Sequence, residues 1–219
     1  MAVRVAVLAS GGGTNLQALL DALEPDGPAQ VVSVISDRAG AGALRRAEQA
    51  GIAAAALRQP ADADELIRAI GGAELVVLAG YLKLVPPAVV ARFPWRMVNI
   101  HPALLPAFGG AGMYGRRVHE AVLASGVRIS GATVHYADEA YDRGPIIAQW
   151  PVPVLADDDA GSLAARVLAV EHLLLPRVVL ALAQLGLPDR PVRLAPRGEL
   201  FRVEAGGTVE VLLDRRATY

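Results

Sequence analysis

Short apolar segments alternate with amphipathic ones along the first 100 residues, and this alternation leaves few architectures open. Between the first two apolar segments, leucines recur at the spacing of one helix face, at Leu16, Leu19, Leu20 and Leu23. Strands that alternate with helices predict a mostly parallel sheet covered on both faces, in a Rossmann-like, doubly wound α/β fold. The predicted strands are short and mostly apolar, as buried parallel strands are: residues 3–9, 31–36, 75–79 and 97–100.

Beyond residue 100 the pattern predicts a mixed, C-terminal part of the sheet. Two further strands are expected at residues 132–137 and 146–154, joined by an acidic loop that contains glycine. Pro151 and Pro153 place the second of these strands at a sheet edge or beyond it, because proline cannot donate to a central ladder. Further helices are predicted at residues 40–50, 62–70 and 116–124.

A long apolar helix is expected to follow these strands. Ser162 can cap a helix that starts at Leu163, Pro176 should kink or interrupt it, and Gly186 should end it. Residues 1–186 are therefore expected to form one domain. Residues 187–219 are expected to form a C-terminal extension with a β-hairpin around residues 205–208, too small for a second domain.

Composition excludes several classes of protein. The net charge is -1, which gives no support for a nucleic-acid partner, and no cysteine is present for a disulfide, a thiolate metal site or a nucleophile. No charged start precedes an apolar run near Met1, so no signal peptide is predicted. Charged residues and Pro176 interrupt the apolar stretch 163–185, so a membrane span is not predicted either. We expect a cytoplasmic protein.

A glycine-rich loop follows the first predicted strand and leads into the first predicted helix. Gly11, Gly12 and Gly13 allow a sharp turn and a close approach of the backbone to a ligand. The free N–H groups of the helix start suit a phosphate. The loop lacks the Gly-Lys-Ser/Thr of a P-loop and the third glycine of a dinucleotide fingerprint, which favours a simple phosphomonoester over ATP or NAD. A tight turn without a ligand is the alternative.

Two polar segments are candidates for the chemistry. Asn99 and His101 end the fourth predicted strand two residues apart, so both should project from the carboxyl edge of the sheet, where such sheets bind ligands. An amide beside an imidazole can polarise a carbonyl and move a proton. Asp142 lies in the acidic loop, and a carboxylate near His101 would favour the imidazolium. The alternatives are a buried histidine with satisfied partners and an aspartate that forms a turn.

Metal and hydrolase sites find no support in these patterns. The four histidines, at 101, 119, 135 and 172, include no i, i+4 pair of the kind that binds zinc on a helix. No Gly-x-Ser-x-Gly elbow is present.

Taken together, these segments resemble the phosphoribosylglycinamide formyltransferases, a family of folate-dependent purine enzymes. The resemblance covers roughly residues 3–185. The Asn-x-His-Pro and Asp-x-Gly-Pro segments are shared by formyl-transferring folate enzymes in general, whereas the glycine loop points to the ribonucleotide substrate. The matching segments occur in the family's order, at residues 8–17, 77–82, 99–106, 131–136, 142–149 and 171–172.

The resemblance implies a reaction and a role for each matching residue. The implied reaction is formyl transfer from 10-formyltetrahydrofolate, a co-substrate, to the amine of glycinamide ribonucleotide, with no metal. The implied catalytic residues are Asn99, His101 and Asp142. The implied ribonucleotide-binding residues are Gly12, Gly13, Thr14, Asn15 and Glu171. The implied folate-binding residues are Leu82, Lys83, Leu84, Val85, Asp138, Glu139, Ala140 and Tyr141.

The chain departs from the family pattern after Pro106. Many members have a short Pro-Gly turn there, whereas this chain has the longer, glycine-rich segment 108–115. Other reactions on the same motifs remain alternatives, with water or methionyl-tRNA as the formyl acceptor. A folate- or nucleotide-binding protein without catalysis is a further alternative, and the joint presence of Asn99, His101 and Asp142 speaks against it.

Overall fold

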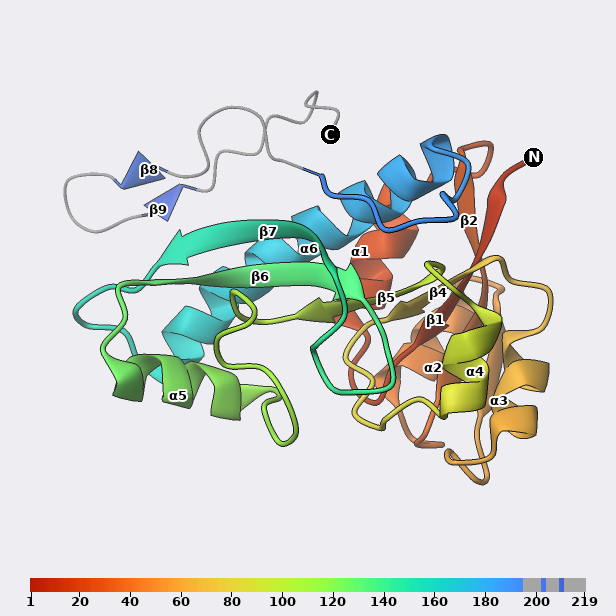
Figure 1. Cartoon of the computed structure of the whole chain (residues 1–219), viewed down its shortest axis with the longest axis horizontal. Coiled ribbons are helices and arrows are strands. Elements are labelled where there is room, and N and C mark those ends of the chain that lie inside the picture. Colours follow the sequence, from red (N-terminus) through yellow and green to blue (C-terminus); the bar gives the residue numbers. More distant parts are fainter. Residues whose placement is uncertain (195–201, 204–208, 211–219) are drawn as a thin grey trace.

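A computed structural model describes residues 1–194, 202–203 and 209–210 of the chain. Its centre is a seven-stranded sheet in the order β3-β2-β1-β4-β5-β6-β7 (Figure 1). The first five strands in this order are parallel, and β6 and β7 are antiparallel to their neighbours. The strands are β1 (Val3–Leu8), β2 (Ala29–Ser36), β3 (Ala53–Ala56), β4 (Leu75–Leu78), β5 (Met97–His101), β6 (Ile129–Tyr136) and β7 (Ile146–Pro153). The predicted α/β fold with a mixed C-terminal part is confirmed.

Helices cover both faces of the sheet because successive residues of a strand point to opposite faces. In β1, Val5 and Val7 face one apolar core, whereas Ala6 and Leu8 face the other. The first core is covered by α1 (Thr14–Ala22), α2 (Gly42–Gln49), α5 (Arg116–Ser125) and α6 (Ala160–Gln184). The second is covered by α3 (Ala63–Ile70) and α4 (Pro87–Arg92).

Helix α6 differs from the sequence prediction at both its start and its interior. Asp159, not Ser162, is the N-cap: its side chain accepts from the N–H groups of Gly161 and Ser162, and Ser162 closes a capping box from inside the helix. The helix continues through Pro176 without interruption. The strand β3 and the helix α4 were not predicted; β3 consists of four exposed alanines, which carry no strand pattern.

The apolar character of α6 has a structural explanation in its packing. By length and composition alone this helix could cross a membrane. However, it lies beside α1 and against β6 and β7 (Figure 1), with Val170, Leu174 and Val178 fully buried. It is thus the central helix of the first core.

The chain beyond α6 returns along the sheet. Leu187 is buried, and the N–H group of Leu194 donates to the carbonyl of Ile147 on β7 at 2.7 Å. Two short strands, β8 (Arg202–Val203) and β9 (Val209–Glu210), pair antiparallel within the expected extension. The expected turn at residues 205–208 lies outside the described residues.

Candidate active site

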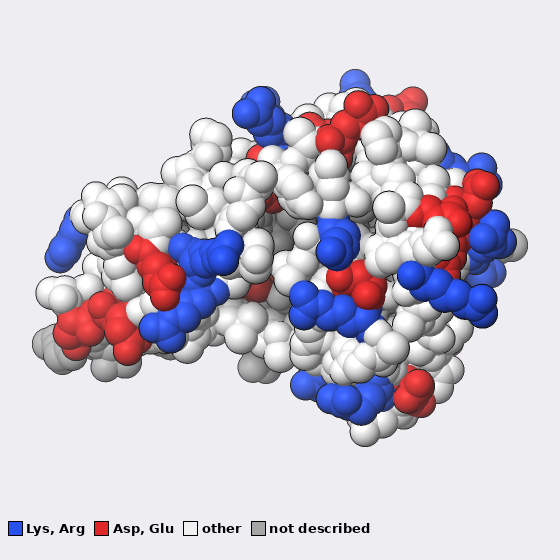
Figure 2. Space-filling model, turned by 90° about the horizontal axis from the view of Figure 1, so that it is seen from below, with Lys and Arg blue, Asp and Glu red and all other residues white. Residues whose placement is uncertain are grey.

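A cavity of about 660 Å³ lies at the carboxyl ends of β4 and β5. The segments after β4 and β5, the loop before β7 and the first turns of α5 and α6 form its walls. Figure 2 shows this hollowed face of the molecule, with acidic and basic side chains interspersed around it. The position agrees with the rule that open α/β sheets bind ligands at the carboxyl ends of their strands.

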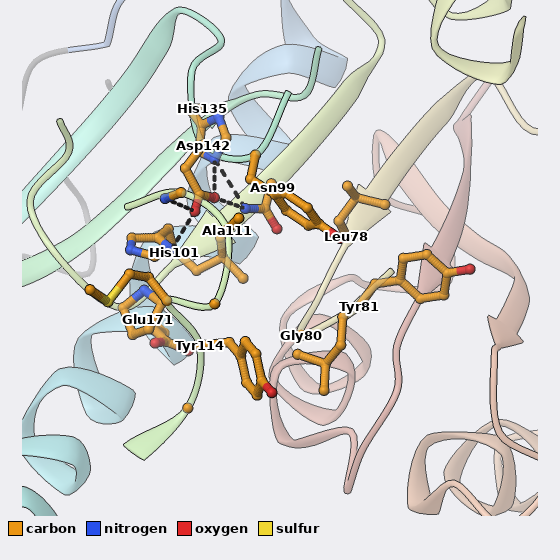
Figure 3. A pocket seen from close by; sticks show the side chains of 18 of the residues that line it. Leu78, Gly80, Tyr81, Asn99, His101, Ala111, Tyr114, His135, Asp142 and Glu171 are labelled. Atoms are coloured by element: carbon orange, nitrogen blue, oxygen red, sulfur yellow. Dashed lines mark hydrogen bonds and ion pairs between the residues drawn. The ribbon is translucent and has the colours of Figure 1, made fainter. Parts of the chain in front are cut away.

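Asn99, His101 and Asp142 meet in this cavity (Figure 3). Asn99 and His101 project from the end of β5, as the i, i+2 spacing predicts. Asp142 comes from the loop between β6 and β7. Its Oδ1 accepts from Asn99 Nδ2 at 3.3 Å, and its Oδ2 lies 3.5 Å from His101 Nδ1. Asp142 has a positive φ of 58°, so it also occupies the turn conformation that the alternative interpretation expected.

His135 completes the cluster and was not assigned a role from the sequence. It lies directly opposite Asn99 in the antiparallel pair of β5 and β6, and its Nε2 is 3.0 Å from Asn99 Nδ2. Nδ1 of the same ring is 2.8 Å from the carbonyl of Tyr136. Since that carbonyl can only accept, Nδ1 carries a proton, while Nε2 faces the Asn99 amide and lies 3.5 Å from Asp142 Oδ1.

The longer glycine-rich segment contacts both members of the histidine–aspartate pair. His101 Nε2 donates to the carbonyl of Phe108 at 2.9 Å, and the N–H group of Gly110 donates to Asp142 Oδ2 at 2.9 Å. Residues 110–115 also line the cavity. The segment in which this chain departs from the family pattern therefore forms part of the site itself.

Burial decides the ionisation of His101. It lowers the pKa of the imidazole, and the Asp142 carboxylate and the Phe108 carbonyl offset only part of this effect. The expected effect of the Asp142 carboxylate on the imidazolium is therefore present, but burial outweighs it, since only 3% of the residue is exposed. The sequence does not reveal how completely the ring is buried. Burial also opposes the charge on Asp142, but the His135 and His101 rings and the Gly110 N–H group hold its pKa below the usual value.

A second polar pair lies elsewhere on the cavity wall. Asn15, at the start of α1, donates from Nδ2 to Glu171 Oε2 of α6 at 2.6 Å. Burial raises the pKa of Glu171 to about 7, although the hydrogen bond from Asn15 lowers it in part. Both residues line the cavity, and Asn15 Oδ1 is buried without a hydrogen-bond partner in the described chain.

The glycine loop lies next to this pair and outside the cavity wall proper. Gly12 and Thr14 are exposed, and Gly13 is the N-cap of α1 with a positive φ of 75°. A Cβ at Gly13 would lie 2.7 Å from the Cα of Ala43, so the turn requires glycine. Within the described chain no side chain caps this helix, which leaves its first N–H groups for a ligand.

The predicted folate-binding segments form another wall of the cavity. Glu139 is exposed and does not line the cavity. The other predicted residues line it: Leu82, Lys83, Leu84, Val85, Asp138, Ala140 and Tyr141. Sequence reasoning missed Tyr81 and His119, which also line the cavity. His119 is 4% exposed, and its Nδ1 has no partner among the described residues. Its place on a predicted helix just after the glycine-rich segment was the available signal.

The fold and the site together define a formyl transferase. The family described as "Formyl transferase" matches residues 3–179, and the chain belongs to this family. Within it, the chain belongs with the phosphoribosylglycinamide formyltransferases. It is 44% identical to the protein of that name from Mycobacterium tuberculosis, over 84% of this chain and 86% of that protein.

Other relatives carry the same name. "Phosphoribosylglycinamide formyltransferase, chloroplastic" from Arabidopsis thaliana is 44% identical over 83% of this chain, which spans only 65% of the length of that plant protein. The crystal structure of the Brucella melitensis protein gives a TM-score of 0.75 at 40% identity, covering 84% of this chain and 96% of that one. The Anaplasma phagocytophilum structure gives 0.77 at 34% identity, covering 100% and 97%.

Proposed function

We propose that this protein transfers the formyl group of 10-formyltetrahydrofolate to the amino group of glycinamide ribonucleotide. The products are formylglycinamide ribonucleotide and tetrahydrofolate, in de novo purine biosynthesis. The main support is one observation: a single cavity contains Asn99, His101 and Asp142 on its wall, together with Asn15 and Glu171 beside an uncapped helix start and an apolar wall after β4. Two ligands of different chemistry can therefore meet at the polar cluster.

The ribonucleotide fits the polar region beside the glycine loop. Its phosphate would accept hydrogen bonds from the N–H groups of Gly12, Gly13 and Thr14, where the helix dipole also favours an anion. Glu171 would bind ribose hydroxyl groups, because its carboxyl faces the cavity and can accept or donate near its pKa of about 7. Asn15 would hold that carboxyl in place through the hydrogen bond between them.

The folate fits the wall formed by the segments after β4 and before β7. Leu82, Leu84, Val85 and Tyr141 provide apolar surface for a flat ring system, and the backbone beside them provides donors and acceptors. The cavity volume of about 660 Å³ lies in the usual range for sites of small organic ligands. The formyl carbon would then lie at the polar cluster.

Asn99 would stabilise the charge that develops on the formyl oxygen when the amine adds. In the structure both amide N–H groups of Asn99 face Asp142 and His135. Donation to the formyl oxygen thus requires the amide to turn end for end, by rotation about one side-chain bond. A donor already aimed at the developing oxyanion contributes about 3 kcal/mol to lowering the barrier, and the cost of this turn reduces the contribution of Asn99.

His101 and Asp142 would move the proton. Since burial lowers its pKa, His101 is mostly neutral at pH 7 and can accept the proton that the amine loses. Nε2 faces the Phe108 carbonyl, so the proton reaches the ring at Nδ1, beside Asp142. The carboxylate stabilises the resulting imidazolium, and the ring then returns the proton to the departing folate nitrogen through an ordered water.

The proposal includes a cytoplasmic location and small-molecule partners only, without nucleic acid or membrane. It is tested by an assay with 10-formyltetrahydrofolate and three competing acceptors: glycinamide ribonucleotide, water and methionyl-tRNA. We expect formyl transfer to the ribonucleotide at a kcat/KM at least a hundredfold above that for either alternative. Preferential hydrolysis, or preferential formylation of the tRNA, would refute the proposal.

A further inference from the structure

Helix α2 packs directly against the glycine loop that follows β1. The N–H group of Ala43 donates to the carbonyl of Gly11 at 3.1 Å. One turn further along the helix, Arg46 Nε donates to the carbonyl of Gly12 at 2.8 Å. A Cβ on Gly42 would lie 3.0 Å from both the Cα and the carbonyl oxygen of Gly12, so helix and loop are in close contact. Two successive carbonyl groups of the loop are therefore held by one helix.

This arrangement determines where the N–H groups of the loop point. In a trans peptide the C=O group and the following N–H group point in opposite directions. With the carbonyls of Gly11 and Gly12 turned toward α2, the N–H groups of Gly12 and Gly13 are turned away from it. Neither N–H group has a hydrogen-bond partner within the described part of the chain. Together with the uncapped start of α1, they form a row of donors that suits an anion.

The side chain of Arg46 is itself held in position. Its Nη1 donates to Gln17 Oε1 of α1 at 2.8 Å, and Gln17 Nε2 donates to Asp21 Oδ1 at 2.8 Å. Nη2, which shares an edge of the guanidinium with the Nε that binds the loop, has no partner among the described residues. A fixed positive charge thus lies against the Gly12 carbonyl, on the side of the loop opposite to its free N–H groups.

We propose that Arg46 is a positioning residue for the substrate phosphate. It holds the Gly12 carbonyl away from the site, so that the loop presents its N–H groups to the phosphate, and its charge adds to the attraction. This inference rests on the proposed function, since it concerns the phosphate of the same ribonucleotide. The contact is between residues 34 positions apart on different elements, so no local sequence pattern could indicate it.

The test compares Arg46→Met with Arg45→Met, a matched control on the same helix at an exposed position. Met preserves the aliphatic stem of Arg46 and removes the donors and the charge. We expect Arg46→Met to raise the KM for glycinamide ribonucleotide at least tenfold, while kcat and the KM for the folate change less than threefold. Arg45→Met should leave all three constants unchanged. Equal losses in both KM values, or an unchanged KM for the ribonucleotide, would overturn the proposal.

Arg46→Lys separates positioning from charge. Lysine keeps the charge but lacks the planar guanidinium that donates to the Gly12 carbonyl and to Gln17 at the same time. It should recover only part of the ribonucleotide affinity; full recovery would show that charge alone acts and would overturn the positioning role. Binding of ribose 5-phosphate, measured by calorimetry, needs no formyl transfer. A wild-type protein that binds this probe, with tenfold weaker binding in Arg46→Met, supports the inference even if the proposed reaction fails. Equal binding by both proteins would overturn it even if the reaction is confirmed.

Discussion

At the scale of single residues, Asp142 connects the candidate site. It contacts Asn99, His101 and His135 through its carboxylate and accepts from the Gly110 N–H group. The meeting of Asn99 with His101 could be predicted, because an i, i+2 spacing on a strand dictates it. The contact of Asn99 with His135 could not, because it depends on the register of the antiparallel pair β5 and β6, which no local sequence pattern fixes.

The change Asp142→Asn should shift the pH dependence of the reaction toward acid. Removal of the carboxylate leaves burial less opposed, so the pKa of His101 falls further below its usual 6.5. If neutral His101 accepts the proton, the acid limb of kcat/KM moves to lower pH. The plateau value of kcat/KM falls at least tenfold, because the His101 imidazolium formed during the reaction loses the Asp142 carboxylate that stabilises it. The checks are the pH profile of kcat/KM and an NMR titration of the His101 ring.

Asp157→Asn is the control for this change, because Asp157 is an exposed acidic residue outside the cavity wall. Its pH profile should match that of the wild-type protein. If Asp142→Asn also keeps the wild-type pH profile and the wild-type titration of His101, Asp142 has no role in the chemistry. It then only forms the turn in which its φ is positive.

At the scale of elements, the strands with apolar, β-branched sequences were predictable, and those without were not. β1 and β4 were predicted to within one residue at each end, whereas the alanine strand β3 carries no signal of burial. The start of α6 was predicted three residues late, since Ser162 and Asp159 both have capping side chains. Which of them serves as the cap depends on where the preceding loop places the chain.

The junction between β6 and β7 leaves no room for a side chain at Gly144. A Cβ there would lie 1.8 Å from the carbonyl oxygen of Tyr136, which is backbone of the neighbouring strand. Gly144→Ala should therefore force the loop away and displace Asp142, two residues earlier. We expect a loss of about 1–3 kcal/mol in the free energy of unfolding and a large fall in kcat. Denaturant unfolding and steady-state kinetics measure the two effects.

Gly40→Ala provides the comparison for Gly144→Ala, since a Cβ at Gly40 would have open space around it. This variant should retain the stability and kcat of the wild-type protein. If Gly144→Ala also has the stability of the wild-type protein, the junction between β6 and β7 accommodates the methyl group without cost. That result would contradict the prediction drawn from the close approach of the two backbones.

At the scale of the whole molecule, the sheet order brings together segments that are far apart in the sequence. The glycine loop after β1, the segment after β4, the end of β5 and the loop before β7 all meet at one end of the sheet. The parallel half of this arrangement follows from strand–helix alternation, and was predictable. The shape of segment 108–115 was not, because its course depends on contacts with His101 and Asp142.

The two proposed ligands should protect different parts of the molecule from amide hydrogen exchange. A non-reactive folate analogue should protect residues 82–85 and 138–142, because these segments line the apolar wall. Ribose 5-phosphate should protect residues 11–16, where the free N–H groups lie. Mass spectrometry of exchanged peptides distinguishes the two patterns. The reverse pattern would mean that the two ligands occupy each other's assigned regions.

The outer edge of β7 has a consequence for how this protein behaves among its own copies. The N–H group of Val154 faces β6, so residues 151 and 153 face outward, and both are prolines that offer no donor. The outward carbonyls of Pro153 and Ile147 already accept from Arg166 and from the Leu194 N–H group. A strand from another molecule could not accept hydrogen bonds from the two prolines. Nor could it donate freely to these two carbonyls, which already accept hydrogen bonds. The edge therefore resists fibril-like stacking of one molecule on another.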